Sequence, residues 1–135
     1  MREVKVTRFV RARPEEVGRV LDPETVVAAE GSFSVAAVEE TDEGTVVTVS
    51  GPGVQLPLRF ERRADGYYYA AEGEVGPFDR METRLVVDAE DEGARLTLRS
   101  TVSLNLPLPF ADRIGAWKRR GELERALEHL AGEVA

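Results

Sequence analysis

The chain contains no cysteine and only one histidine, His129. The lack of cysteine excludes a disulfide scaffold, a cysteine-ligated zinc site and a thiol nucleophile. A single histidine excludes a multi-histidine metal site and argues against a Ser-His-Asp triad. His129 itself is expected to be exposed near the end of a helix, where it complements the helix dipole. We therefore expect neither a metal nor a cofactor.

Lysine is also scarce, since Lys5 and Lys118 stand against 16 arginines. Acidic residues outnumber basic ones by 25 to 18, which gives a net charge of −7 and is typical of a high-salt cytoplasm or a GC-rich genome. A negative surface repels phosphates, so binding to nucleic acid or to anionic membranes is disfavoured overall. No apolar run approaches the roughly 20 residues of a membrane helix, and no signal peptide is evident. We expect a cytoplasmic protein without stable membrane insertion.

What is present is the composition of a globular protein. The 135 residues are 42% hydrophobic and 32% charged. This length and composition predict one domain, 1–135.

The N-terminal part predicts a strand and two short helices. Residues 2–10 are rich in β-branched side chains, which favour a strand. Pro14 opens a predicted helix, because proline suits the first turn and the two acidic residues after it complement the helix dipole. An Asp-Pro pair at 22–23 ends that helix, and 23–30 predict a second one.

From residue 32 the hydrophobic pattern alternates, as in antiparallel strands with one face on a core. Leu96, Leu98 and Ser100, for example, alternate with polar side chains. Turns rich in glycine and proline, among them 51–53 and 73–77, indicate hairpins. The predicted strands are 32–39, 45–50, 54–62, 67–74, 80–88 and 94–104.

A long helix is predicted at 109–131, after two prolines that end the last strand. Its apolar side chains form a stripe that rotates slightly past a glycine: Phe110, Ile114, Trp117, Leu123, Leu127 and Leu130. The order of elements predicts an α+β fold, in which a curved seven-stranded antiparallel sheet wraps around the long C-terminal helix and two short helices follow the first strand.

This arrangement is similar to that of the START-like superfamily, also called SRPBCC or helix-grip proteins. The segments 10–17 and 20–24 resemble the family's opening pattern, in which a proline begins the helix and an Asp-Pro-Glu segment closes it. The segment 93–98 resembles the family's Gly-x-x-Leu-x-x last strand. Gly18 departs from the pattern, because many members have Trp or Phe there. This departure predicts a looser helix or a larger cavity beneath it.

The resemblance implies a hydrophobic pocket between the sheet and the long helix. Some family members carry lipids, quinones or hormones, and others are polyketide cyclases. Others assist enzymes, as the carbon monoxide dehydrogenase G subunit does. The fold alone therefore implies no particular activity.

The strand alternation predicts which side chains face such a pocket. The inward registers of the later strands carry hydroxyls but no carboxylate. General acid–base catalysis usually needs a carboxylate or histidine beside the substrate, so no catalytic residue is predicted. The predicted inward-facing residues are Leu56, Leu58, Phe60, Tyr67, Tyr69, Met81, Thr83, Leu85, Leu96, Leu98, Ser100, Ile114, Trp117 and Gly121. All but Leu96 and Gly121 are candidate ligand contacts.

Two basic features have alternative interpretations. Arg8 is a charged residue on an otherwise apolar strand face. It either anchors a ligand carboxylate or phosphate or lies at a sheet edge. Because burial of an unpaired charge is costly, the sheet edge is favoured. The basic run 118–120 is either a solvated helix face, which is the more common case, or a docking site for an acidic partner or lipid headgroup. For Tyr67 and Tyr69, ordinary packing and ligand contact both remain open.

Three functions remain. The first is binding of a small hydrophobic molecule, such as a lipid, isoprenoid or quinone. The second is a polyketide cyclase- or dehydratase-like enzyme, in which Tyr67, Tyr69 or Arg8 polarises a carbonyl. The third is an accessory interaction module with a filled interior. The expected partner is a small hydrophobic molecule rather than nucleic acid, with a protein partner possible and a monomeric or dimeric state.

Overall fold

The computed structural model describes the chain except for residues 1, 52–53, 72–77, 105–108 and 135. In chain order the elements are β1 (Arg2–Val10), α1 (Pro14–Val20), α2 (Pro23–Glu30), β2 (Ser34–Thr41), β3 (Gly44–Gly51), β4 (Val54–Arg63), β5 (Gly66–Ala71), β6 (Phe78–Glu90), β7 (Gly93–Leu104) and α3 (Ala111–Val134).

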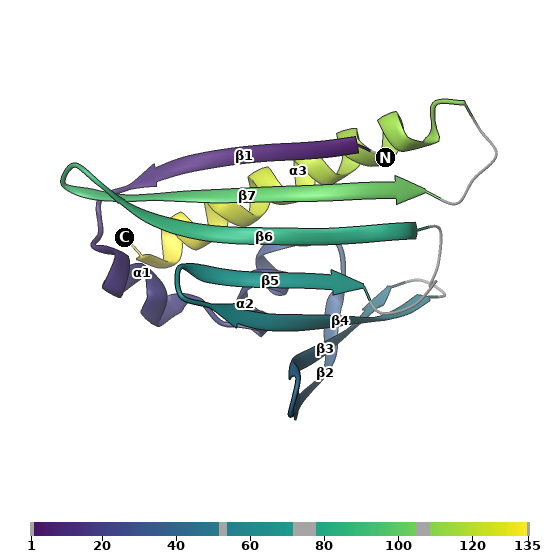
Figure 1. Cartoon of the computed structure of the whole chain (residues 1–135), viewed down its shortest axis with the longest axis horizontal. Coiled ribbons are helices and arrows are strands. Elements are labelled where there is room, and N and C mark those ends of the chain that lie inside the picture. The colour runs from purple at the N-terminus through teal and green to yellow at the C-terminus, as the bar shows by residue number, and fades with distance from the viewer. Residues whose placement is uncertain (1, 52–53, 72–77, 105–108, 135) are drawn as a thin grey trace.

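The strands form one seven-stranded sheet in the order β1-β7-β6-β5-β4-β3-β2 (Figure 1). Every neighbouring pair is antiparallel. Apart from β1, which lies beside β7, the strands follow one another as a meander. The two edge strands are therefore β1 and β2.

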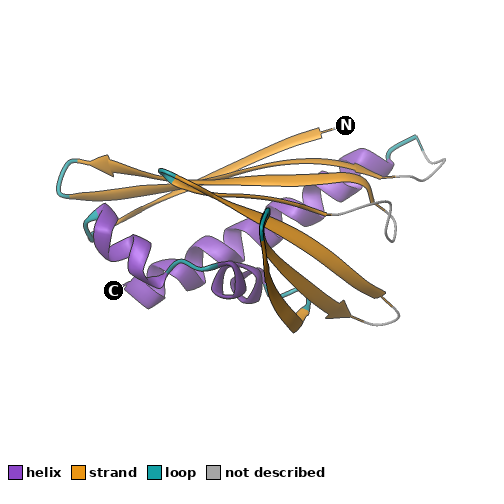
Figure 2. Ribbon diagram, turned by 60° about the horizontal axis from the view of Figure 1, so that its bottom comes forward, coloured by secondary structure: helices purple, strands orange, loops and turns teal. Residues whose placement is uncertain are grey.

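The three helices lie on the same side of the sheet, which curves around them (Figure 2). α3 packs on β1, β7 and α2. α2 in turn contacts β2 and β3 near the other edge. The concave face of the sheet, α2 and α3 together enclose the interior.

Local sequence explains why the short helices begin and end where they do. α1 starts with Pro14 and has two acidic residues in its first turn. The side chain of Asp22 caps α2 by accepting a hydrogen bond from the Thr25 amide at 2.8 Å. Gly31 ends α2 in the left-handed conformation, with φ 77°, which only glycine adopts without strain.

The predicted α+β helix-grip architecture is confirmed, including the two short helices after the first strand. Element boundaries differ from the predictions by a few residues, for example at α3, which was predicted at 109–131. The turns predicted at 51–53 and 73–77 lie almost wholly outside the described residues, as does the end of the strand predicted at 67–74. Within the described part of the chain, no helix is long and apolar enough to cross a membrane.

Candidate functional site

A cluster of polar side chains lies in the interior, where the sheet, α2 and α3 meet. Each member is less than a tenth exposed, and the other buried side chains of the described core are mostly apolar. We call this set the Arg119 cluster. Its members are Arg119, Glu30, Glu122, Tyr69, Thr83 and Ser100.

Three of the members form a row across the concave face of the sheet. Tyr69 on β5 pairs with Thr83 on β6, and Thr83 pairs with Ser100 on β7. Directly paired residues point to the same face of a sheet, so the three hydroxyls lie side by side. The Thr83 and Ser100 hydroxyl oxygens are 3.0 Å apart.

Arg119 reaches this row from α3. Its Nη2 donates to Thr83 Oγ1 at 2.7 Å and to the Tyr69 hydroxyl at 3.2 Å, and its Nε donates to Ser100 Oγ at 3.2 Å. Its Nη1 lies 2.8 Å from Glu30 Oε1 and 3.4 Å from Glu122 Oε1. Carboxyl groups therefore hold Nη1, whereas neutral hydroxyls hold Nη2 and Nε.

The two carboxyl groups come from helices. Glu30 is the last residue of α2, and its Oε1 accepts a hydrogen bond from the Tyr69 hydroxyl at 2.6 Å. Glu122 lies one turn after Arg119 on α3 and accepts a hydrogen bond from the Ser32 hydroxyl. The Tyr69 ring stacks on Phe60 with 4.3 Å between ring centroids, which fixes its hydroxyl toward Glu30.

Burial controls the protonation of the cluster. It raises the pKa of Glu30 above the ordinary 4.5, although Arg119 and Tyr69 act in the opposite direction. It also raises the pKa of Tyr69, as does the charge of Glu30, so the hydroxyl keeps its proton. Burial alone would lower the pKa of Arg119, but attraction by Glu30 and Glu122 and the hydrogen bond to Tyr69 raise it, and the guanidinium stays charged.

The cluster thus presents a fixed positive charge, three hydroxyls and a carboxyl with increased proton affinity. These groups are suited to hydrogen-bonding a carbonyl or hydroxyl oxygen, and Glu30 is suited to transferring a proton. Among the described residues, no three His, Cys, Asp or Glu side chains gather as a metal site requires.

No family model and no curated protein matches this sequence. Solved structures do match. A Thermus thermophilus protein is 22% identical, with a TM-score of 0.77 and coverage of 98% of this chain and 97% of the other. A START superfamily protein of Mycobacterium smegmatis is 17% identical, with a TM-score of 0.74 and coverage of 98% and 96%. The chain has a START-like fold.

The same fold occurs in an enzyme. The Zhui aromatase/cyclase of a Streptomyces species is 17% identical, with a TM-score of 0.77, and covers 98% of this chain and 93% of its own. At these sequence identities the likeness shows a shared START-like fold and nothing about activity.

The strand register places most of the predicted inward-facing residues in the interior of this START-like fold. Tyr67 is half-buried, and its hydroxyl donates to the Leu21 carbonyl at 3.4 Å. Gly121 is half-buried as well. Contact of any of them with a ligand stays a prediction. The buried ones are Leu56, Leu58, Phe60, Tyr69, Met81, Thr83, Leu85, Leu96, Leu98 and Ser100.

The predicted inward face of the long helix is wrong in its N-terminal half. Ile114 is 60% exposed and Trp117 is 77% exposed, so neither lines the interior. The prediction of a solvated run at 118–120 holds for Lys118 and Arg120 but is wrong for Arg119, which is 4% exposed. α3 instead turns Arg119 inward, where it bonds the row of hydroxyls on the sheet.

The expectation of an interior without carboxylates is also wrong. The inward strand registers are free of them in the described residues, as predicted, but Glu30 and Glu122 enter from the helices. A signal existed for Arg119: the stripe of Leu123, Leu127 and Leu130, extended backward by four residues at helical spacing, reaches position 119, whereas position 117 lies on another side of the helix. Nothing comparable marks Glu30, which follows directly on the apolar residues of α2.

Other singled-out residues lie on the surface. His129 is exposed, as expected, and its Nδ1 lies 3.1 Å from the Ala29 carbonyl. Gly18 is exposed and borders a surface hollow of about 160 Å³, and a Cβ added there meets nothing within 4 Å. The looser helix or larger cavity predicted from this residue stays a prediction. Arg8 lies on edge strand β1 and is exposed, in agreement with the edge interpretation.

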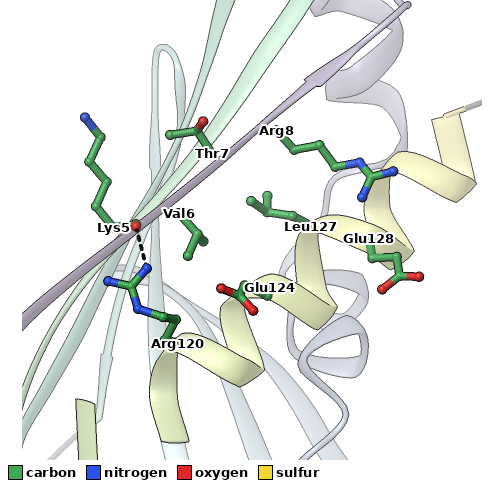
Figure 3. A pocket seen from close by; sticks show the side chains of 8 residues that line it. All are labelled: Lys5, Val6, Thr7, Arg8, Arg120, Glu124, Leu127 and Glu128. Carbon is green, nitrogen blue, oxygen red and sulfur yellow. Dashed lines mark hydrogen bonds between the residues drawn. The ribbon is translucent and has the colours of Figure 1, made fainter. Parts of the chain in front are cut away.

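Arg8 borders a surface groove of about 560 Å³ between β1 and α3 (Figure 3). Arg120 crosses one end of it and donates to the Lys5 carbonyl at 3.4 Å. Two smaller surface hollows lie near Arg8–Ala12 and near Gly18. None of these three hollows is lined by a member of the Arg119 cluster.

Proposed function

We propose that residues 1–135 act as one START-like domain that binds a small, mainly apolar molecule carrying a carbonyl or hydroxyl group. The apolar part lies between the sheet and α3, and the oxygen reaches the Arg119 cluster. The observation that carries this proposal is a charged guanidinium, 4% exposed, among three hydroxyls on the concave face of the sheet.

A contribution to stability does not by itself explain the Arg119 cluster. Burial of charges in an ion pair is expensive, and apolar side chains of similar volume often stabilise a core equally well. Convergent polar groups in an apolar interior are instead typical of sites that orient a ligand. The cluster therefore supports recognition of a polar group.

The hydrogen-bond pattern supports one position for the ligand oxygen in this proposal. Nη1 of Arg119 is fixed by Glu30 and Glu122. Nη2 and Nε contact only hydroxyls, which rotate and exchange partners. The ligand oxygen would accept from Nη2 in place of the Tyr69 hydroxyl or Thr83. The Thr83 hydroxyl, or a Tyr69 hydroxyl that turns from Glu30 to the ligand, would donate to it. The apolar part would contact Leu56, Leu58, Phe60, Met81, Leu85 and Leu98.

The test uses prodan, a fluorescent and mainly apolar ketone whose emission responds to hydrogen bonding at its carbonyl. We expect binding by the wild type and roughly fivefold weaker binding by Tyr69→Phe, because one hydrogen bond of about 1 kcal/mol is lost. The matched control is Tyr68→Phe, which removes the neighbouring hydroxyl on the opposite face of β5, bonded to Glu82 at 2.7 Å. Absence of binding, or equal weakening by both variants, would refute the proposal and favour an accessory module with a filled interior.

A second candidate is proton transfer at a bound carbonyl compound, as in a cyclase- or dehydratase-like enzyme. The Glu30 carboxyl favours it, because it has a raised pKa and lies 2.6 Å from the Tyr69 hydroxyl. Deuterium exchange at the methylene beside the prodan carbonyl, followed by NMR in D₂O, reports such transfer. We expect Glu30→Gln to retain binding and lose any protein-catalysed exchange. Exchange unchanged in Glu30→Gln would exclude Glu30 as the base.

A further inference from the structure

The outer surface of α3 carries an apolar stripe that the proposed interior site does not use. We call it the outer stripe and define it as Phe110, Ile114 and Trp117, which are 60%, 60% and 77% exposed. Five large hydrophobic side chains are exposed in the described part of the chain, and these three are the most exposed of them. Large apolar side chains that gather in one exposed region are typical of interaction sites.

Helical spacing makes the stripe continuous. Ile114 and Trp117 lie one turn apart on α3. Phe110 directly precedes the helix, and its carbonyl accepts a hydrogen bond from the Ile114 amide at 3.0 Å, so the three side chains share one side at the start of α3. Arg119 points to the interior on the other side. The N-terminal half of α3 is thus amphipathic, but its orientation is reversed. Its inner side carries Arg119 of the polar cluster, and its outer side carries the large apolar residues.

Basic residues flank the outer stripe. Arg113, Lys118 and Arg120 are exposed, and the Arg113 guanidinium carbon lies 5.5 Å from the centroid of the Phe110 ring. On this helix Asp112 is half-buried, and the exposed acidic residues begin at Glu124. A locally positive apolar surface therefore stands on a chain with a net charge of −7.

This combination favours one occupant. Aromatic and aliphatic side chains between arginine and lysine are typical of helices that lie in the headgroup region of a bilayer. Two outer stripes in contact would bring their basic flanks together, which disfavours a second copy of this chain. The N-terminal end of α3 also lies toward one end of the molecule (Figure 1).

We propose that the outer stripe docks reversibly on membranes that contain anionic phospholipids. Phe110, Ile114 and Trp117 enter the headgroup region, and Arg113, Lys118 and Arg120 contact the phosphates. The negative charge of the rest of the chain keeps the docking weak, reversible and oriented. The proposal goes beyond the interior site and does not depend on it.

Trp117 is the sole tryptophan of the chain and lies in the stripe, so it serves as the probe. We expect its emission to shift to shorter wavelength, and its quenching by acrylamide to decrease, when vesicles of phosphatidylcholine mixed with phosphatidylglycerol are added at low salt. Vesicles of phosphatidylcholine alone should have a smaller effect, and salt should weaken the response. No change with the anionic vesicles at low salt would overturn the proposal.

Matched variants separate the stripe from general charge effects. In a co-sedimentation assay, Arg113→Gln combined with Lys118→Gln should weaken vesicle binding roughly thirtyfold, since each basic residue near an anionic surface contributes about fivefold. Arg11→Gln combined with Arg62→Gln makes the same charge change at exposed positions elsewhere. Ile114→Glu should abolish binding, whereas Val38→Glu, at an exposed valine on β2, should not. Equal effects within either pair would contradict the proposal.

Two further outcomes identify other occupants. An emission shift that depends on protein concentration without vesicles, together with a dimeric mass, would replace the membrane by a second copy. Tyr69→Phe should retain wild-type vesicle binding, so failure of the interior site and failure of membrane docking are distinguishable.

Discussion

At the scale of single residues, Glu30 is the group whose titration should be visible in the stability of the whole protein. Its raised pKa means that the folded state binds this proton more tightly than the unfolded chain does. The stability from that proton is fully present below the ordinary carboxyl pKa of 4.5 and is lost as the pH rises through the raised value.

We therefore expect the free energy of unfolding to decrease as the pH rises above 4.5, and Glu30→Gln to remove that part of the slope. Urea unfolding midpoints at a series of pH values measure it. Glu124→Gln, at an exposed carboxyl of α3, is the control and should keep the wild-type slope. A Glu30→Gln profile parallel to the wild type would show that Glu30 does not hold its proton more tightly when folded.

At the scale of elements, the end of α2 determines where Glu30 lies. Gly31 follows it with φ 77°, and a Cβ there would lie 3.6 Å from Arg125 Nε, an ordinary contact. Replacement is therefore unfavourable because of the backbone conformation rather than the available space. Gly18 in α1 presents the opposite case, since it is helical and a Cβ meets nothing within 4 Å.

We expect Gly31→Ala to lower the free energy of unfolding by roughly 1 kcal/mol, which is the penalty for a side chain in the left-handed conformation. Gly18→Ala should raise it by about 0.5–1 kcal/mol, because alanine loses less backbone entropy in a helix. Denaturant unfolding of both variants provides the comparison. Effects of the same sign would contradict this account of the two helices.

At the scale of the whole molecule, the helices hold the two sides of the sheet unequally. α3 packs on β1 and β7, and β7 is almost wholly paired with β6 and β1. β2 is an edge strand, and seven of its eight residues are exposed. Few buried contacts favour local opening.

We expect amides of Ser34–Thr41 to exchange with solvent faster than those of Gly93–Leu104, as measured by hydrogen exchange and mass spectrometry. Equal protection of the two strands would mean that β2 is covered in solution. Repeating the exchange at lower protein concentration then distinguishes two causes. Protection of β2 by a second copy of the chain decreases on dilution, whereas protection intrinsic to the fold does not.

The sequence by itself determined the order and type of the elements. Alternation over 94–104, the proline at 14 and the Asp-Pro pair at 22–23 act through local backbone preferences, which need no distant partner. The same alternation determined that Tyr69, Thr83 and Ser100 share the inner face of the sheet, because side chains in a strand alternate strictly.

Only the tertiary structure decided which side of α3 faces inward. Apolar residues at 114 and 117 and at 123, 127 and 130 mark different sides of the helix, so its pattern is compatible with more than one rotation. The choice depends on partners for Arg119, and these come from positions 30, 69, 83, 100 and 122, on four other segments of the fold as well as α3 itself. A charged side chain is buried only where such partners converge, and their convergence is a property of the folded chain.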